Sequence, residues 1–229
     1  MENISEEKKQ KLSNNLKKVN DDIEKAKKEK NITKDIKLIA VSKKRKIEDI
    51  KIIYDNGQRI FGENYVNELL EKYENLPKDI EWHLIGHLQT NKVKHLVEKI
   101  PNIIIESVDS VKVAEAINKH ATQKIKVYIE VNIGNTETKT GADIKDIYNI
   151  AETIINKCEK LELIGIMSLG NVNNLNEFKQ MIDIKNDFCN KYNLNKEKFI
   201  ASFGTSQDYY NAILSGSDEI RVGHTIFEI

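Results

Sequence analysis

Short apolar runs alternate eight times with segments of helical periodicity along this sequence, and this alternation restricts the possible folds more than any other feature. Runs this short are typical of buried strands, whereas apolar residues that recur every three or four positions indicate helices packed by one face. We expect strands at residues 37–43, 59–62, 82–85, 103–105, 125–131, 161–167, 199–203 and 219–222. We expect the helices between them near residues 47–54, 64–73, 93–100, 114–121 (with Asp109 as N-cap), 144–154 and 175–188, and before Gly216.

Strands and helices in strict alternation imply right-handed crossovers and a parallel sheet. Eight such units predict an α/β fold, namely a single (β/α)8 barrel of the TIM type with an additional N-terminal helix. The alternative is an open doubly wound sheet. The leading helix carries a narrow apolar seam, which we expect to pack on the barrel rather than on a partner helix. We therefore predict a helix over residues 1–30 and a barrel over residues 31–229. The seam consists of Leu12, Leu16, Val19 and Ile23.

The charge balance restricts the partners of the chain. Lys and Arg together number 36, as do Asp and Glu, so the formal net charge is zero. This balance argues against nucleic acid or an anionic membrane as the main partner. Cys158 and Cys189 are expected within helices as free thiols, and the charged N-terminus is unlike a secretory signal. With no apolar run long enough to span a bilayer, these features predict a cytoplasmic protein.

Lys43 is the most informative residue at the end of a predicted strand. The active sites of (β/α)8 barrels lie at the C-terminal ends of their strands. Burial at the end of an apolar strand can lower the pKa of a lysine, and the neutral amine can then form a Schiff base with an aldehyde. The alternative is that Lys43 is a solvated lysine that ends the strand.

Two stretches of small residues follow the seventh and eighth predicted strands. They are Gly204-Thr205-Ser206 and Arg221-Val222-Gly223-His224. Exposed backbone N–H groups and helix dipoles bind phosphate at this position in many barrels. Together with Lys43 across the barrel mouth, the two stretches predict a site for a phosphorylated aldehyde or ketone. The alternative is that these glycines are ordinary turn residues.

Other candidate residues carry weaker signals. His83 and His87 are four positions apart, but they lie in and after a predicted strand, and no acidic or cysteine ligand adjoins them in sequence, so we expect no metal site. Glu63 and Glu130 could form paired carboxylates, although nothing in the sequence distinguishes them from other glutamates at strand ends. Neither a P-loop nor a Gly-x-Ser-x-Gly motif is present.

Several longer motifs resemble the pyridoxal phosphate homeostasis proteins, also called proline synthetase co-transcribed homologues. The resemblance extends from about Lys37 to Phe227. The motifs are Ala40-Val41-Ser42-Lys43, residues 57–66, residues 81–92, Val131-Asn132-Ile133 with Lys139 and Gly141, Gly165-Ile166-Met167 and Arg221-Val222-Gly223.

The resemblance implies a single barrel like the N-terminal domain of alanine racemase. It further implies that pyridoxal 5′-phosphate (PLP) is held as an internal aldimine on Lys43, with Arg221 facing the pyridine nitrogen. The phosphate would lie against Ser206, in the turn with Gly204 and Thr205, and against the backbone of Gly223 and His224. Asn64 and His83 would lie near the cofactor.

The sequence departs from the family pattern in two places. The family usually has a methionine-rich turn after the seventh strand, where this chain has Ser202-Phe203-Gly204-Thr205-Ser206. The family also usually continues from Ile-Phe to a glycine and a basic tail, whereas this chain reads Phe227-Glu228-Ile229. The first departure retains the small residues and Ser206, so phosphate binding is still expected.

Three functions are compatible with these residues. The preferred one is a protein of intracellular PLP homeostasis that binds and releases PLP without substantial turnover. The second is a small PLP-dependent amino-acid racemase, and the third is a cofactor-free Schiff-base aldolase. Arg221 stays protonated and gives no proton to the ring nitrogen, and a racemase needs a second base, which its two-domain relatives take from a domain not expected here. The expected partners are PLP and apo PLP-dependent enzymes, and the expected assembly is a monomer or a weak homodimer.

Overall fold

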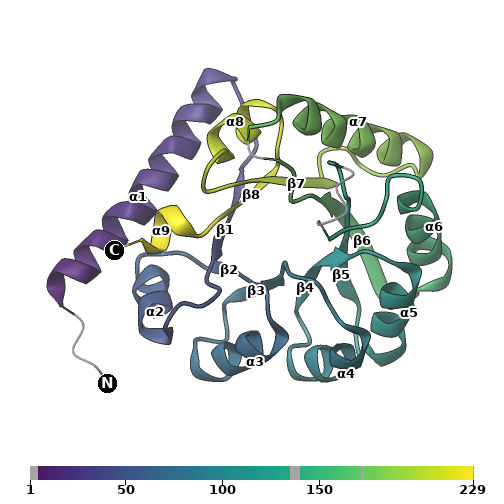
Figure 1. The fold of residues 1–229 in the computed structure, drawn as a ribbon, viewed down its shortest axis with the longest axis horizontal. Coiled ribbons are helices and arrows are strands. Elements are labelled where there is room, and N and C mark those ends of the chain that lie inside the picture. Colours follow the sequence, from purple (N-terminus) through teal and green to yellow (C-terminus); the bar gives the residue numbers. More distant parts are fainter. Residues whose placement is uncertain (1–4, 135–139, 172, 229) are drawn as a thin grey trace.

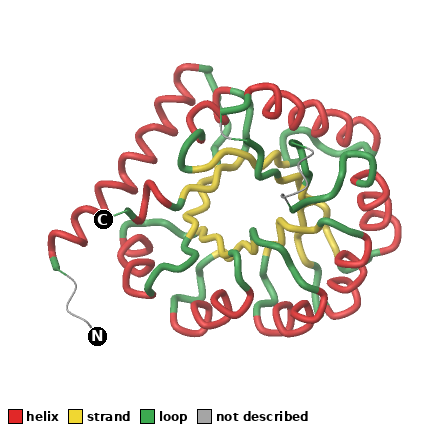
Figure 2. The backbone as a smooth tube through the Cα atoms, viewed as in Figure 1, coloured by secondary structure: helices red, strands yellow, loops and turns green. Residues whose placement is uncertain are grey.

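Eight parallel strands close into a barrel in which each strand pairs with the next in the chain and β8 pairs with β1. The computed structural model describes residues 5–134, 140–171 and 173–228. The strands form the inner ring, and helices surround them (Figures 1 and 2). The predicted (β/α)8 barrel is therefore confirmed, and the open sheet is excluded. The strands are β1 (Lys37–Val41), β2 (Ile60–Glu63), β3 (Glu81–Leu84), β4 (Ile104–Val108), β5 (Ile125–Glu130), β6 (Leu161–Met167), β7 (Ile200–Thr205) and β8 (Glu219–Val222).

The helices follow the strands in the order that the apolar periodicity predicts. Gly57, just beyond the end of α2, has a φ of 100°, a conformation that favours glycine at this position. The helices are α1 (Glu6–Glu29), α2 (Ile47–Asp55), α3 (Val66–Asn75), α4 (Thr90–Lys99), α5 (Val111–His120), α6 (Ile147–Lys157), α7 (Leu175–Lys191), α8 (Tyr209–Leu214) and α9 (His224–Phe227).

Several predicted boundaries are wrong by a few residues. Helix α3 begins at Val66 rather than Asn64, and Ile144 lies in a turn before α6. The N-cap of α5 is Ser110, whose hydroxyl accepts a hydrogen bond from Val113 N at 3.3 Å. Asp109 is instead bound to His87 at 3.0 Å. A hydroxyl and a carboxylate are both good N-caps, so tertiary contacts decided between these neighbours.

Helix α1 packs against the outside of the barrel beside α2, α8 and α9 (Figure 1). Its predicted seam is buried, and each of these side chains stabilises the contact by about 1.5–3 kcal/mol. Polar contacts fix its direction: Asn15 Nδ2 donates to the carbonyl of Glu228 at 2.8 Å, and Tyr209 donates to Asp22 at 2.6 Å. The helix that follows β8, α9, has only one turn. Helix α1 therefore covers the part of the sheet that a longer helix after β8 would cover.

The apolar core lies between the sheet and the helices, and it contains both free cysteines. Cys189 lies in α7, and Cys158 directly follows α6 rather than lying within it. The interior of the barrel is unusual because polar side chains fill much of it, where branched apolar residues are the norm. These buried residues include His83, Glu106, Ser202, Glu219 and Arg221. In the part of the chain that the structure describes, no helix is both long and apolar enough to cross a membrane.

Candidate functional site

A cavity of about 300 Å³ opens where the strands end, around Lys43 and Arg221. Seven of the nine residues expected to hold a cofactor line it. The two others, His83 and Gly204, lie beneath it and beside it. The lining residues are Val41, Lys43, Asn64, Ile85, Leu169, Thr205, Ser206, Gln207, Arg221, Gly223 and His224.

Lys43 lies in a turn two residues beyond the end of β1, and its side chain is exposed. The expectation that burial at the strand end desolvates Lys43 is therefore wrong for this ligand-free structure. Among the described residues, no side chain or backbone group forms a hydrogen bond or an ion pair with its ammonium. The Lys43 amine is thus free to meet a ligand in the cavity.

Ser206 and the backbone after β8 line the cavity on the same side as Lys43, because β8 pairs with β1 and Gly223 lies against Val41. The expectation that Lys43 lies across the barrel mouth from these residues is therefore wrong. The Ser206 hydroxyl oxygen accepts hydrogen bonds from the N–H groups of Gly223 at 3.0 Å and Thr225 at 3.4 Å. One oxygen that accepts from two backbone N–H groups occupies the kind of position that an anion oxygen takes in a backbone cradle. Gly204 supports this turn with a φ of 100°, and a Cβ there would lie 2.5 Å from the Cβ of Ala212. Any other residue would push α8 away from β7.

Arg221 forms the floor of the cavity, and only 1% of its side chain is exposed. Its guanidinium donates to Ser202 Oγ and, at 2.6 Å, to the carbonyl of Ser168. Its Nε is buried and has no partner among the described residues. The same holds for Oδ1 of Asn64, on the adjacent wall. Unpaired buried polar atoms are costly, and these two belong to residues that line the cavity, where a ligand can pair with them.

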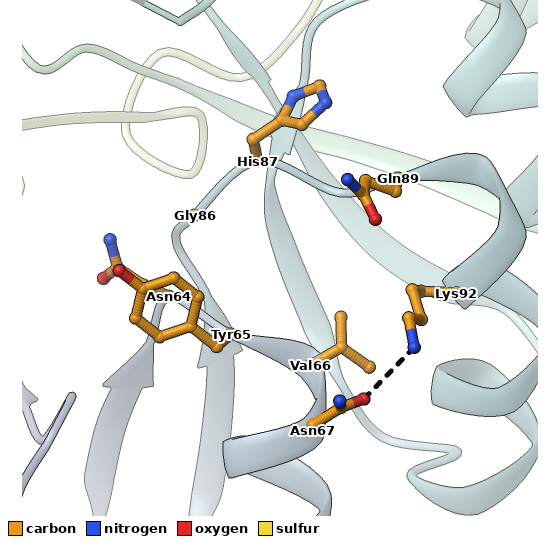
Figure 3. A pocket seen from close by; sticks show the side chains of 8 residues that line it. All are labelled: Asn64, Tyr65, Val66, Asn67, Gly86, His87, Gln89 and Lys92. Atoms are coloured by element: carbon orange, nitrogen blue, oxygen red, sulfur yellow. Dashed lines mark hydrogen bonds between the residues drawn. The ribbon is translucent and has the colours of Figure 1, made fainter.

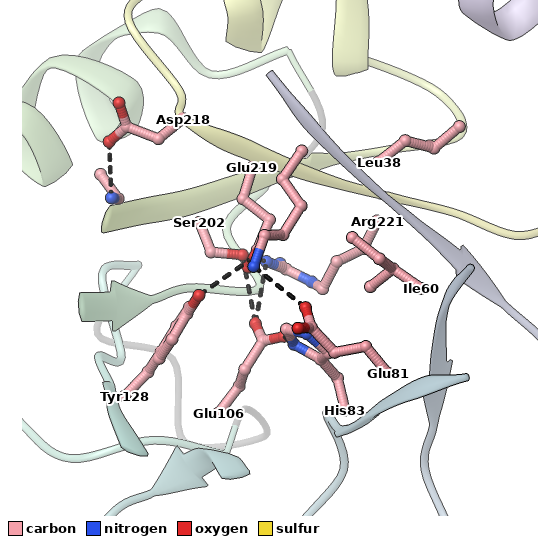
Figure 4. A network of polar contacts seen from close by, with 12 residues as sticks. Leu38, Ile60, Glu81, His83, Glu106, Tyr128, Ser202, Asp218, Glu219 and Arg221 are labelled. Carbon is pink, nitrogen blue, oxygen red and sulfur yellow. Dashed lines mark hydrogen bonds and ion pairs between the residues drawn. The ribbon is translucent and has the colours of Figure 1, made fainter. Parts of the chain in front are cut away.

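A hydrogen-bonded network continues from Arg221 into the barrel (Figure 4). Ser202 Oγ donates to Glu106 at 3.2 Å, and Glu106 also contacts His83 Nδ1 at 2.6 Å. The other His83 nitrogen meets Glu81 at 3.1 Å, and Glu81 accepts from Lys37 at the far end of the barrel. Glu219 joins this barrel-interior network through Tyr128 at 3.0 Å and through Lys37, 3.9 Å away. His83 is therefore connected to the cavity through Glu106, which contacts Arg221 directly at 4.0 Å and also through Ser202.

The charges of this network shift the pKa values of its members. Burial lowers the pKa of His83, but hydrogen bonds to Glu106 and Glu81 outweigh burial and raise it to about 9. The hydrogen bond from His83, opposed by burial and helped by Lys37, lowers the pKa of Glu81 to about 2. Burial and the neighbouring Glu106 raise the pKa of Glu219 to about 7. With His83 protonated, three cations face the carboxylates of Glu81 and Glu106, and Glu219 adds a third carboxylate above about pH 7.

His83, Glu106 and Glu219 also present the ligand atoms of a potential metal site, since these atoms lie within 4.8 Å of one another. The expectation that His83 lacks acidic neighbours is thus wrong, both in space and along the sequence, where Glu81 is two residues away and contacts His83 at 3.1 Å. We interpret the set as an ion-pair network because Lys37 and Arg221 already supply its positive charge. Glu63 and Glu130 do not pair with each other: Glu63 contacts Ser42 and Lys72, and Glu130 contacts Thr140.

Comparisons with known proteins agree with this geometry. Residues 12–229 match the family described as the alanine racemase N-terminal domain. The human pyridoxal phosphate homeostasis protein is 36% identical over 208 residues, which cover 83% of this chain and 75% of the human protein. This chain belongs to the pyridoxal phosphate homeostasis protein family. The family resemblance noted in the sequence is therefore confirmed.

Solved structures extend the comparison from sequence to shape. A protein of unknown function from Bifidobacterium adolescentis has a TM-score of 0.89 at 28% identity, covering 99% of this chain and 98% of its own. PipY of Synechococcus elongatus, solved with PLP bound, has a TM-score of 0.77 at 28% identity, covering 94% and 99% of the two chains. Alanine racemase from Corynebacterium glutamicum shares the fold, with a TM-score of 0.73 at 14% identity over 96% of this chain and 61% of the racemase.

A second cavity of about 330 Å³ lies beside the first, and Asn64 lines both (Figure 3). It contains Lys92, whose ammonium is 3.4 Å from Asn67 Oδ1, and His87 on the opposite side. Four residues of the motif over residues 81–92 line this cavity, namely Gly86, His87, Gln89 and Lys92, whereas Ile85 lines the one around Lys43. Lys139, another residue of the motifs, lies outside the described residues.

Sequence reasoning missed the residues that support the site from behind. Glu106 and Tyr128 face the barrel interior, and Lys72 and Glu68 lie behind the turn of Lys43. A signal was present for the first pair, because a glutamate or tyrosine within an apolar strand of a barrel points to a polar interior. No comparable signal distinguishes Lys72 from the many solvated lysines of this chain.

Proposed function

We propose that this protein binds PLP through Lys43 and serves intracellular PLP homeostasis as a reversible carrier. The observation that supports this most is a single cavity that combines the free amine of Lys43, the backbone cradle around Ser206 and the buried guanidinium of Arg221. An aldehyde, a phosphate and a ring nitrogen are the three groups that such a set can bind together. PLP is bound in PipY, which shares this fold.

The residues of the cavity fit PLP in size and in hydrogen bonding. A volume of about 300 Å³ lies at the lower end of the range for small-ligand sites, about 300–1,000 Å³. The unpaired Nε of Arg221 is a donor without an acceptor, which the ring nitrogen can satisfy. The N–H groups of Gly223 and Thr225 now bind the Ser206 hydroxyl and are correctly placed for a phosphate oxygen.

The chain's own groups have distinct tasks in this proposal. Lys43 would hold the cofactor by its amine, which can condense reversibly with an aldehyde and release one water. Arg221 donates a hydrogen bond to the ring nitrogen and keeps its proton, so the ring stays a poor electron sink. Ser206 and the N–H groups of Gly223 and Thr225 hold the phosphate. When bound, the cofactor would supply an electrophilic carbon that an incoming amine can attack, which would release the Lys43 amine.

The test is the visible absorption of the purified protein with PLP, followed by borohydride reduction and peptide mapping. Reduction should fix the cofactor to the peptide that contains Lys43. Lys44 and Lys92 are the informative alternatives, because Lys44 is the next residue and Lys92 lines the neighbouring cavity. A label on either one, with Lys43 unmodified, would reject the assignment. A colourless protein that acts on aldehydes without PLP would instead favour the aldolase.

We further propose that the protein has no substantial racemase, decarboxylase or transaminase activity. A racemase needs a second base near the substrate carbon, across the ring from Lys43. Of the described residues that line the cavity, His224 is the remaining candidate base, but it adjoins the phosphate cradle and contacts Glu228 at 3.2 Å. Arg221, a cation that could bind a substrate carboxylate, is held by Ser202 and Ser168.

This proposal is tested by α-proton exchange in heavy water with a panel of L- and D-amino acids. We expect no more than single-turnover exchange, together with transfer of PLP to an added apo-enzyme. Multiple turnovers in the wild type that are lost in Lys43→Ala would reject the carrier function and support the racemase function.

A further inference from the structure

Lys72 is a buried lysine of α3 that lies directly behind the turn of Lys43. Only 4% of its side chain is exposed, and its ammonium has three acceptors. These are the carbonyl of Ser42 at 2.7 Å and carboxylate oxygens of Glu63 and Glu68, each at 2.6 Å. Lysine is rarely buried unless it is paired, and here all three of its N–H donors are used.

The partners of Lys72 bracket Lys43 on both sides. Before it, Ser42 is held twice, by its carbonyl to Lys72 and by its hydroxyl to Glu63 at 2.7 Å. After it, the backbone N–H of Lys44 donates to the same Glu68 oxygen that Lys72 contacts. One cluster of charged side chains therefore fixes the peptide groups on either side of the reactive residue.

The backbone of this turn needs such support. Lys44 has a φ of 58°, a left-handed conformation that glycine or asparagine adopts more readily than lysine. The turn is closed by a hydrogen bond from Arg45 N to the carbonyl of Ser42 at 3.0 Å. Lys72 holds the Glu68 carboxylate in place, and this carboxylate accepts a hydrogen bond from the backbone N–H of Lys44. Without the cluster, the turn could relax and carry Lys43 away from the cavity.

We propose that Lys72 is a positioning residue for Lys43, which it holds at the distance from the cavity that Schiff-base formation requires. This inference rests on the proposed function. The Lys43 side chain has no partner among the described residues, so its reach into the cavity depends on where its backbone is fixed. The orientation of two reacting groups strongly affects how fast and how completely they form a bond. A purely structural Lys72 would instead join β2 to α3 and affect all ligands of the cavity alike.

Two ligands separate these roles. PLP carries the aldehyde, whereas pyridoxamine 5′-phosphate has the same ring and phosphate but forms no Schiff base with a lysine. In Lys72→Met, we expect the affinity for PLP to fall about tenfold. This fall corresponds to the loss of about one hydrogen bond to a charged group. The visible band per bound PLP should weaken, while the affinity for pyridoxamine 5′-phosphate should stay within about twofold of wild type. Equilibrium titrations of both ligands and absorption spectra provide the readouts.

Lys185→Met is the matched control. Lys185 is another buried helical lysine, bound to Asp218 at 2.7 Å, and it does not line the cavity. Its loss should leave the ratio of the two affinities unchanged. If Lys72→Met also leaves that ratio and the visible band unchanged, Lys72 does not position Lys43 and the inference is overturned.

A milder variant covers the case in which Lys72→Met does not fold. Glu68 is 22% exposed, so Glu68→Ala should fold while it removes the acceptor of Lys44 N. We expect a smaller fall of PLP affinity, about two- to fivefold, again without effect on pyridoxamine 5′-phosphate. An unchanged ratio in this variant would count against the inference. Failure of the proposed function looks different, because wild type would then show no visible band and Lys43→Ala would bind PLP as wild type does.

Discussion

Arg221 lies between two contrasting regions, the closed polar interior of the barrel and the open cavity at its mouth. In the interior, His83, Glu106 and Glu219 are buried; a hydrogen bond joins His83 to Glu106, and Tyr128 donates a hydrogen bond to Glu219. At the mouth, Lys43 and His224 are exposed, and the Lys43 ammonium has no partner among the described residues. The contrast suggests a division of tasks: the interior holds the ring-binding guanidinium rigidly, and the mouth leaves the amine free to form and release a bond.

Charge balance explains why the interior can be polar at all. Transfer of an isolated charge out of water costs far more than a single hydrogen bond recovers, so buried charges persist only in compensated sets. The interior meets this condition with Lys37, His83 and Arg221 against Glu81, Glu106 and Glu219. The mouth faces no such constraint, because water screens its charges. Stability should therefore depend on the interior, and ligand retention on both regions.

The largest expected effect is that of Arg221→Ala. This variant removes two hydrogen bonds and leaves Glu106, which is fully buried, without the cation 4.0 Å away. We expect the free energy of unfolding of the ligand-free protein to fall by about 3–5 kcal/mol in urea denaturation. Any PLP still bound should have a shifted absorption spectrum, because the ring nitrogen has lost its donor.

Arg59→Ala is the control for this prediction. Arg59 is an exposed arginine that contacts Asp79 at 3.2 Å, and its loss should cost about 0–1 kcal/mol. Equal losses for the two variants would mean that the interior network adds no more stability than a surface ion pair. An unchanged spectrum and affinity in Arg221→Ala would reject its role at the ring nitrogen.

His83→Gln should remove a pH dependence that is confined to the interior. The pKa of His83 is raised from 6.5 to about 9, so the folded protein keeps a proton that the unfolded chain releases. This contribution to stability is fully present below pH 6.5 and is lost as pH rises through about 9. Between pH 8 and 9, above the pKa of Glu219, which is about 7, the free energy of unfolding of the wild type should fall by at most about 1.4 kcal/mol per pH unit.

Urea denaturation at several pH values in this window checks the prediction. In His83→Gln, the slope should be close to zero, whatever the absolute stability of the variant. If the slope in the variant is equally steep, another group causes the pH dependence, and His83 is neutral in the folded protein.

Ser206→Ala tests the phosphate side of the mouth. The loss of two modest hydrogen bonds to Gly223 and Thr225 should lower the stability of the ligand-free protein by about 1 kcal/mol. Affinity for PLP should fall by about 1.5–3 kcal/mol, the contribution of a hydrogen bond to a charged group. Affinity for pyridoxal, which lacks the phosphate, should not change. An equal loss for both ligands in calorimetric titrations would show that Ser206 shapes the cavity without binding phosphate.

The same contrast explains what the sequence could and could not predict. The eight strands were predictable because short, mainly apolar segments alternate with segments of helical periodicity, and Ser206, Gly223 and Arg221 were predictable because they lie at or just beyond the ends of strands seven and eight. Lys43 was identified correctly as a lining residue but for the wrong physical reason, since it is exposed in a turn. The pairing of residues within the interior network was not predictable, because its members come from β1, β3, β4, β5, β7 and β8 and meet only when the barrel closes.

The smallest expected effect on stability, and the sharpest test of the comparison, is that of Lys43→Ala. The Lys43 side chain is exposed and makes no described hydrogen bond, so its removal should change the free energy of unfolding of the ligand-free protein by no more than about 0.5 kcal/mol. The same variant should abolish the visible band with PLP and leave the affinity for pyridoxamine 5′-phosphate nearly unchanged. Lys44→Ala, one residue further along the turn, should retain the band. If Lys43→Ala loses as much stability as Arg221→Ala, the mouth contributes to stability as the interior does. If the visible band remains in Lys43→Ala, the Schiff base forms on another lysine.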